Sequence, residues 1–387
     1  MPHLKWLLLC LVLFSPLGID IYLPAIPAIA QGLGAEESLI QSTVSLFLLM
    51  MGLGQVIAGP LCDRFGRRPV ALGGMALYLA GALMAVCAES GALFVFSRLL
   101  QGLAVCGTSV VAFSAVRDTL EGEESARAYS FLNGTLNIVP ALAPLLGGLL
   151  AEQFGWQAPF WLLVVYSLAM MAVMARFLPE TKPANTRVQG GLPLRQYARI
   201  LGDGRFLGFA LVNGAGMGMV LSYVSLAPQV LISQVGLSPV AFSLVFGING
   251  LWIMAASYLA NQVIRRFGRV NCLATAVVLL GLGALSLQGA YLLAGSTVLA
   301  YMLPVALACA GFAFALGPAT SYALAPFGEE AGVASAMLMF VQMAGASVIG
   351  LVVLALPQAP QPALAGAMVL AALTSLQGVA RARRQPS

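Results

Sequence analysis

Long runs of apolar residues, separated by short polar gaps, dominate this 387-residue chain. Hydrophobic residues make up 60% of it and charged residues only 9%, a composition that does not suit a water-soluble globule. A helix of about twenty apolar residues crosses a hydrocarbon core of roughly 30 Å. The runs therefore predict an all-α integral membrane protein with twelve transmembrane helices. They cover residues 4–25, 39–61, 70–88, 91–116, 126–151, 157–178, 206–229, 239–264, 271–292, 297–324, 331–356 and 363–379.

Basic residues between the predicted helices lie on one side of the membrane. An excess of Lys and Arg in short loops marks the cytoplasmic side. We therefore expect a multi-pass protein with both termini in the cytoplasm, and we interpret the net charge of +5 as a sign of topology rather than of nucleic-acid binding. The opposite side carries four glutamates and neither Lys nor Arg: Glu36, Glu37, Glu89 and Glu152.

The first apolar run follows Lys5 and ends among small residues, a pattern that is also typical of a secretory signal peptide. If this run is retained as a spanning helix, all the basic loops that follow lie on the same side of the membrane. We therefore expect it to remain as the first transmembrane helix.

Few residues of the chain suit catalytic chemistry. The six cysteines are dispersed without a CxxC pair, which predicts neither disulfides nor a metal site. The single histidine, His3, argues against a histidine-based catalytic site or proton relay. No GxxxxGK[ST] loop is present to hold ATP. We expect no catalytic residues, no cofactor and no metal, which disfavours a membrane enzyme and an ATP-driven pump.

The chain divides into two similar halves. The sequence RFGR at residues 64–67 recurs at residues 266–269, each time after the second helix of a predicted group of six. Such a repeat indicates two parallel bundles related by an axis along the membrane normal. We expect a six-helix bundle over residues 1–178, a cytoplasmic linker over 179–205, and a second bundle with a short basic tail over 206–387.

Two opposite charges lie inside apolar runs, Asp20 near the end of the first helix and Arg98 within the fourth. A charge in the bilayer costs at least ~2.5 kcal/mol, so these residues are expected to be functional. Their distances from the outer boundary, at ~1.5 Å rise per residue, place them at a similar depth. Burial favours a neutral Asp20 and a nearby arginine favours its carboxylate, so this residue suits a proton switch. A static structural ion pair is the alternative.

Four stretches, in this order and spacing, resemble the major facilitator superfamily and, more closely, the drug:proton antiporters of its Bcr/CflA group. They are GIDIYLP at 18–24, GPLCDRFGRRP at 59–69, RLLQG at 98–102 and PALAPLLGG at 140–148. The resemblance covers nearly the whole chain. It implies the major facilitator fold, a place in the bacterial cytoplasmic membrane, and proton coupling through Asp20 and Arg98.

The loop after the second helix suits a gate formed by ion pairs, because an aspartate stands beside three arginines and a glycine permits a sharp turn. In the resembling family this loop stabilises one conformation, and Glu121, Glu123 and Glu124 are the expected acidic partners. In the second copy Arg265 replaces the aspartate, which predicts an asymmetric gate. The alternative is that the arginines only fix topology. The gate residues are Asp63, Arg64, Gly66, Arg67 and Arg68.

The predicted fifth helix carries Pro140 and Pro144 followed by Gly147 and Gly148. Proline removes backbone donors and glycine lets another helix approach closely, so this segment suits a hinge or gate. Ordinary use of proline and glycine in membrane helices is the alternative. In the resembling family this motif favours exchange over symport.

Polar and aromatic residues inside the predicted helices are candidates for a substrate cavity, although each is equally suited to a hydrogen bond between helices. A mostly apolar cavity with few polar groups suits varied lipophilic compounds. The candidates are Tyr22, Gln55, Asn133, Asn137, Asn213, Tyr223, Gln229, Asn249, Tyr258 and Gln342.

The leading expectation is a monomeric, proton-driven exporter of small hydrophobic or amphipathic drugs, with chloramphenicol-type antibiotics implied by the resemblance. Its partners would be the drug, protons and the lipid bilayer, with no nucleic acid. A proton-coupled exporter of a metabolite, such as an amino acid or a nucleoside, remains the alternative.

Overall fold

The computed structural model describes residues 2–183 and 193–384, which contain helices and no strands. Asn133 and Asn137 lie in α6, but their side chains fall outside this description. The elements, in chain order, are α1 (Pro2–Asp20), η1 (Leu23–Ala25), α2 (Ile26–Gly32), α3 (Glu37–Phe65), α4 (Arg67–Val86), α5 (Gly91–Thr119), α6 (Gly122–Phe154), α7 (Ala158–Phe177), α8 (Leu194–Gly202), α9 (Gly204–Pro228), η2 (Gln229–Gln234), α10 (Pro239–Ala294), α11 (Val298–Leu324), η3 (Ala325–Glu330), α12 (Ala331–Ala355) and α13 (Pro360–Arg383).

The described helices confirm the predicted all-α membrane class. Ten segments are long and apolar enough to cross a membrane. One of them, α10, contains 56 residues and two membrane-length parts on either side of Gly268, and α6 adds the shorter apolar segment Val139–Phe154. Counted in this way, the described chain is consistent with twelve spanning helices.

Two local features differ from the prediction. The first span is not one regular helix, because α1 ends at Asp20 and a 3₁₀ turn, η1, leads into α2. Pro24 lies within η1, and proline lacks the N–H that an α-helix needs there. The predicted linker also contains the short helix α8, whose Tyr197 and Ile200 are buried while its other residues are more accessible.

The repeated RFGR sequence has the same backbone conformation in both copies. Gly66 has φ 99° and ψ 164°, and Gly268 has φ 84° and ψ 166°. This region of φ and ψ is essentially restricted to glycine. The match gives the repeat a physical basis, since both copies need glycine to turn the chain from one helix into the next.

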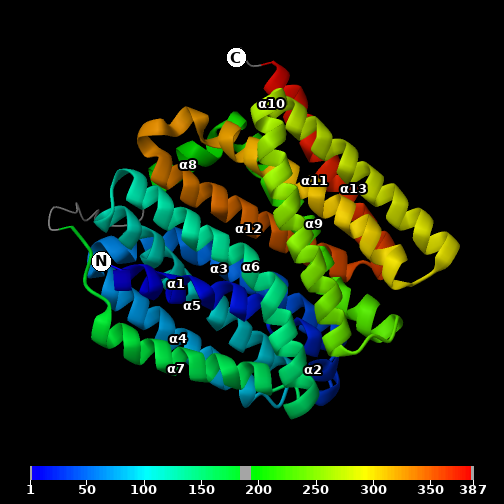
Figure 1. The fold of residues 1–387 in the computed structure, drawn as a ribbon, viewed down its shortest axis with the longest axis horizontal. Helices are drawn as coiled ribbons and strands as arrows, with labels where there is room; N and C mark the ends of the chain where they lie inside the picture. Colours follow the sequence, from blue (N-terminus) through cyan, green and yellow to red (C-terminus); the bar gives the residue numbers. More distant parts are fainter. Residues whose placement is uncertain (1, 184–192, 385–387) are drawn as a thin grey trace. The chain divides into compact units, whose positions relative to one another are not determined.

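The chain forms two compact units: residues Met1–Pro193 with Pro239–Gly247, and residues Leu194–Ser238 with Ile248–Ser387. In the first unit α5 packs against both α3 and α4, which touch each other much less (Figure 1). In the second unit α9 packs against α11, α12 and α13. Each unit thus places one helix at the centre of several neighbours.

Helix α6 remains helical through both of its internal prolines, Pro140 and Pro144. One turn later Gly147 lies directly against the backbone of Ile21, so that a Cβ on this glycine would be 1.6 Å from the Ile21 carbonyl oxygen. The hydroxyl of Ser243, at the start of α10, donates a 2.8 Å hydrogen bond to the Pro144 carbonyl oxygen. The glycine is therefore required by packing.

The substitution Gly147→Ala is expected to destabilise the protein by about 1–3 kcal/mol, because the added methyl group overlaps backbone atoms that cannot rotate away. Thermal unfolding of the purified protein in detergent measures this effect. The matched control is Gly366→Ala in α13, where a Cβ meets no atom within 4 Å; it is expected to be neutral or slightly stabilising. Equal losses in both variants would contradict the close approach of α6 to Ile21.

Candidate functional site

Arg98 lies at the centre of the first unit and is fully buried, with 0% of its surface exposed. Helix α5 carries it, and its guanidinium donates hydrogen bonds to the carbonyl oxygen of Gly18 on α1 and to the side-chain oxygen of Gln101. Gln101 is three residues further along α5, so both side chains share a face of the helix. The arginine thus joins α5 to the end of α1.

Three aromatic rings complete the surroundings of this guanidinium. Its central carbon lies 4.4 Å from the ring centroid of Tyr22, 4.9 Å from that of Phe47 and 5.8 Å from that of Phe160. Cation–π contacts of this kind contribute about 2 kcal/mol each when the pair is desolvated. Tyr22 is held in place by a 2.8 Å hydrogen bond between its hydroxyl and that of Thr43. The rings come from α3, from α7 and from the turn that follows α1, so the guanidinium joins three separate segments of the first unit.

Asp20, the last residue of α1, is buried with 6% of its surface exposed. Within the described chain, no ion pair of 4.0 Å or less joins it to Arg98, whose guanidinium instead bonds to the carbonyl two residues earlier. The interpretation of a static ion pair therefore does not hold in this structure. The two charges lie near the same end of α1 without neutralising each other by contact.

Several polar groups at this site have unused hydrogen-bonding capacity. In the described part of the chain, Arg98 Nε, Gln101 Nε2 and the Tyr78 hydroxyl have no hydrogen-bond partner. Buried polar groups are usually paired, so unpaired ones indicate strain or function. The Tyr78 oxygen lies against Gly18, 2.6 Å from where a Cβ would stand. Sequence reasoning missed Tyr78, Phe47 and Phe160; Gln101 could have been found from its spacing to Arg98.

Arg67 forms the second charged centre, where the basic loop meets α4. The side chain is buried, and it makes ion pairs of 2.9 Å with Asp63 and 2.8 Å with Asp118. Asp118 lies near the end of α5, and its side chain is only 5% exposed. The ion pairs therefore connect the ends of α3, α4 and α5.

The expected acidic partners of this loop were wrong. Glu123 pairs instead with Arg127 on the exposed surface of α6, and the described contacts of Arg67 include neither Glu121 nor Glu124. Those three glutamates follow a turn after α5, whereas Asp118 is still on the helix and points toward α4. The signal that could have found it is the acidic residue directly after Arg117 at the end of an apolar run.

Glu180, just beyond α7, closes the same loop from the other side. Its carboxylate accepts hydrogen bonds from the backbone N–H groups of Arg67, at 2.9 Å, and Arg68, at 3.2 Å. These N–H groups lie in the first turn of α4 and therefore have no partner within the helix. A negative charge is favoured at this end of a helix. A Cβ on Gly66 would lie 2.5 Å from this carboxylate, which is a second reason for glycine at the turn.

The pKa of Glu180 reflects these contacts. Partial burial alone would raise this pKa, but the backbone N–H groups that donate to the carboxylate, above all that of Arg67, hold it below its ordinary value of 4.5. The charged form is therefore the one that the fold stabilises.

The second copy of the loop is built differently, in line with the expected asymmetry. Arg269 donates a 2.8 Å hydrogen bond to the Ser321 hydroxyl and lies 4.5 Å from the ring centroid of Tyr322. Its described contacts include no carboxylate. The glycine turn is thus repeated, but the ion pairs are not.

The candidate cavity residues have varied surroundings. Asn213 donates a 2.9 Å hydrogen bond to Thr320, and Asn249 contacts the Cys309 sulfur at 3.7 Å. Both asparagines are buried and join helices of the second unit. Tyr223 is buried beside Tyr301, whereas Tyr258 is 67% exposed. Gln55, Gln229 and Gln342 are half-buried. A role of these residues in substrate binding stays a prediction.

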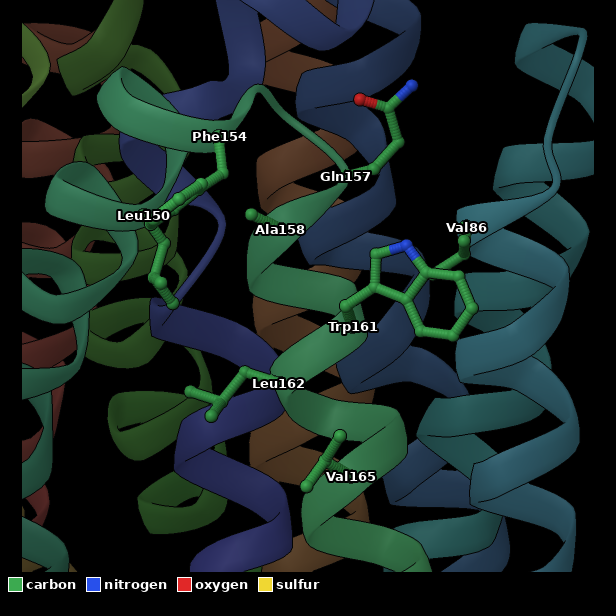
Figure 2. Close-up of a pocket in the computed structure, with 8 residues that line it drawn as sticks. All are labelled: Val86, Leu150, Phe154, Gln157, Ala158, Trp161, Leu162 and Val165. Carbon is green, nitrogen blue, oxygen red and sulfur yellow. The ribbon is translucent and has the colours of Figure 1, made fainter.

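The first unit also contains two apolar grooves. The outer groove has a volume of about 720 Å³ and lies among α4, α6 and α7, where Figure 2 shows Trp161 beside Val86, and Leu150 with Phe154 on α6. The second, which we call the α3–α4 groove, has a volume of about 430 Å³ and is lined by residues of α3, α4 and α5. Both volumes fall in the range of small-molecule sites.

The described chain is thus a membrane-spanning helical bundle with a repeated glycine turn and a fully buried arginine. The chain belongs to the Major Facilitator Superfamily, whose family model matches residues 8–351. This confirms the resemblance and the predicted fold class, and it places the chain among transporters rather than enzymes.

Two curated relatives are similar along most of the chain. One, from Klebsiella pneumoniae, is named multidrug resistance protein MdtL and is 34% identical over 344 residues, which cover 88% of this chain and 86% of the relative. The protein of the same name from Escherichia coli O45:K1 is 33% identical over 337 residues, covering 87% and 84%.

Solved structures share the fold at low sequence identity. A peptide transporter in complex with sulfate has a TM-score of 0.79 and 13% identity, with coverage of 98% of this chain and 94% of that one. A D-xylose–proton symporter has a TM-score of 0.76 and 16% identity, with coverage of 96% of each chain.

The substitution Asp118→Asn is expected to destabilise the protein by about 1–3 kcal/mol, because it leaves the buried Arg67 with one carboxylate instead of two. Glu123→Gln is the control, since it breaks an exposed pair whose side chains are 75% and 87% accessible and which contributes about 0.3–0.5 kcal/mol. Thermal unfolding in detergent compares them. A loss for Asp118→Asn no larger than that of the control would argue against a structural role for the buried pair.

Glu180→Gln is expected to weaken the response of stability to acid. Because the folded state lowers the pKa of Glu180, its contribution is present above its ordinary value of 4.5 and is lost as the pH falls through the lower, folded value. Melting temperatures measured from neutral to acidic pH should therefore fall less steeply for this variant than for the wild type. The exposed Glu152→Gln serves as control, and parallel curves for Glu180→Gln and wild type would contradict the assignment.

Proposed function

We propose that this protein exports small hydrophobic or amphipathic drugs in exchange for protons. The observation that carries the proposal is the arrangement at the end of α1, where Asp20 is buried and forms no ion pair in the described part of the chain, two residues from the carbonyl that Arg98 binds. The names of the relatives, multidrug resistance proteins, support drugs as the cargo. The apolar helices offer few groups that would select a sugar or a phosphate.

Proton exchange follows from competition for Arg98. When Asp20 is neutral, the guanidinium keeps its hydrogen bonds to Gly18 and Gln101. When Asp20 loses its proton, the carboxylate competes for the same guanidinium, and an ion pair in a low-dielectric interior is a strong attraction. The end of α1 then has two arrangements, one for each protonation state, which is what a proton-coupled conformational change requires.

One proton per cycle is the simplest stoichiometry, since Asp20 is a single carboxylate. Exchange of a neutral drug for one proton moves one charge across the membrane, so each 100 mV contributes ~2.3 kcal/mol. Exchange of a monovalent cationic drug for one proton moves no net charge across the membrane.

The ion pairs of the basic loop suit a gate that holds one conformation. Arg67, Asp63 and Asp118 tie three helix ends together at the face where the basic residues gather. The residues of α6 around Pro144 and Gly147 suit the moving part, because proline leaves a backbone carbonyl without its helical donor.

The site of action is proposed to be the bacterial cytoplasmic membrane, with both termini in the cytoplasm. The distribution of basic residues supports this orientation. We propose that the protein acts as a monomer, because one chain contains both compact units.

The deciding experiment uses everted membrane vesicles whose interior has been made acidic. Addition of chloramphenicol should dissipate the pH gradient in vesicles with the wild-type protein and not in those with Asp20→Asn. Glu152→Gln, an exposed carboxylate outside the site, is the control and should behave as wild type.

Each other outcome has a defined meaning. No dissipation by the wild type with chloramphenicol, but dissipation with an amino acid or a nucleoside, would overturn drug export in favour of a metabolite. Equal dissipation by wild type and Asp20→Asn would place the proton site elsewhere.

A further inference from the structure

The α3–α4 groove exists because two helices approach a third more closely than they approach each other. A Cβ on Gly74 of α4 would lie 2.9 Å from the Ala104 carbonyl oxygen, and a Cβ on Gly107 of α5 would lie 3.0 Å from that of Val70. On the other side, Gly54 of α3 packs against Cys106. These glycines draw α3 and α4 onto α5 and leave a furrow between them.

Protein atoms do not fill this furrow. Gly73 lines it from α4, and a Cβ built on Gly73 meets no atom within 4 Å. The furrow has a volume of about 430 Å³ and is open at the surface of the described bundle. A molecule from outside the chain can therefore lie in it and make van der Waals contacts with its walls.

The walls of the groove are apolar. The Cys106 thiol is an exception, and it lies 3.0 Å from the Met51 carbonyl oxygen. The rim is formed by exposed apolar side chains, with Ile57 at 42%, Leu61 at 40% and Phe65 at 58% exposure. A polar or charged molecule would lose its hydration here without compensation. The occupant must be a hydrocarbon along this length.

The length of the groove fits one leaflet of the membrane. Its α3 wall runs from Gly54 to Phe65, which is roughly 16 Å at a rise of ~1.5 Å per residue. The hydrocarbon core of a bilayer is ~30 Å thick, so one leaflet is about half of this. A single acyl chain that lies parallel to the helices would match the groove from the membrane midplane to the headgroups.

The end of the groove at Phe65 and Pro69 carries an available positive charge. Arg64 is exposed, its guanidinium carbon lies 5.2 Å from the Phe65 ring centroid, and in the described chain it forms no ion pair. The nearby carboxylates have other partners, since Asp63 pairs with Arg67 and Glu180 accepts backbone N–H groups. A phosphate at this depth would find Arg64 free to bind it.

The outer groove serves as a contrast. Its lining includes Gln157 and Trp161 but no basic residue (Figure 2), and the exposed charge near it on α6 is the acidic Glu152. An apolar chain could lie there, but nothing would favour an anionic headgroup. The combination of an apolar furrow with a free arginine at its mouth distinguishes the α3–α4 groove.

We propose that the α3–α4 groove is a binding site for an anionic phospholipid, with one acyl chain in the furrow and the phosphate at Arg64. The assignment to the cytoplasmic leaflet rests on the proposed orientation of the chain; the binding itself does not. A lipid bound there would connect α3 and α4 directly beside the ion pairs of Arg67 with Asp63 and Asp118.

Native mass spectrometry of the delipidated protein in detergent tests the proposal, with dioleoyl phosphatidylglycerol as the anionic probe and dioleoyl phosphatidylcholine as the zwitterionic one. The wild type is expected to retain one phosphatidylglycerol in preference to phosphatidylcholine. Gly73→Leu should lose this bound lipid, because leucine fills the furrow. Gly281→Leu on α10 is the matched control, since a Cβ there also meets nothing within 4 Å, and it should bind as wild type.

Arg64→Gln provides an independent second variant at an exposed position. It should bind phosphatidylglycerol about fivefold more weakly, because one arginine near an anionic headgroup contributes about 1 kcal/mol. The loss should be smaller for phosphatidylcholine, because its choline already offsets the charge of the phosphate. Equal binding of both lipids by the wild type, unchanged binding by Gly73→Leu, or equal losses in Gly73→Leu and Gly281→Leu would each overturn the proposal. The assay requires neither a drug nor a proton gradient, so its failure is distinct from a failure of drug export.

Discussion

A guanidinium can lie inside a membrane bundle only if other groups replace the water around it, and the first unit is arranged around this requirement for Arg98. A backbone carbonyl from α1, an amide oxygen from α5 and rings from α3, α7 and the end of α1 surround the charge. None of these groups is itself charged. The described contacts of the guanidinium therefore include no carboxylate, and Asp20 is buried nearby without an ion pair to it.

The two loops that follow the second helix of each half share a backbone geometry but differ in the contacts of their arginines. Both turn at a glycine with nearly the same φ and ψ. In the first loop a buried arginine and two aspartates fasten three helix ends, and Glu180 covers the exposed N–H groups of the next helix. In the second loop the matching arginine, Arg269, contacts the Ser321 hydroxyl and the Tyr322 ring instead. Among the described contacts, the loop arginine pairs with carboxylates in the first copy and not in the second.

Much of the fold could be predicted from the sequence because apolar length alone determines membrane spans, and the repeated glycine predicted a repeated turn. The two stranded charges were likewise visible as exceptions to the apolar pattern. Of the partners of Arg67, Asp63 could be predicted from its place in the same loop, but Asp118 and Glu180 could not. Glu180 is 113 residues away along the chain, and only packing brings it to Arg67. The break after Asp20 was also missed, since hydropathy does not change where the backbone turns. The choice between cavity and packing roles for residues such as Asn213 depends on neighbours that a single sequence does not reveal.

The contact between Gly147 and Ile21 has a mechanical consequence. Backbone rests on backbone there, with no side chain in between that could change rotamer and absorb a displacement. Ile21 follows Asp20 directly, so any shift at the end of α1 bears on α6 within the same turn. Helix α6 is also the one with prolines at 140 and 144, where it has the least resistance to bending. The end of α1 that carries Asp20 and the proline-containing part of α6 are thus coupled through a direct contact between their backbones.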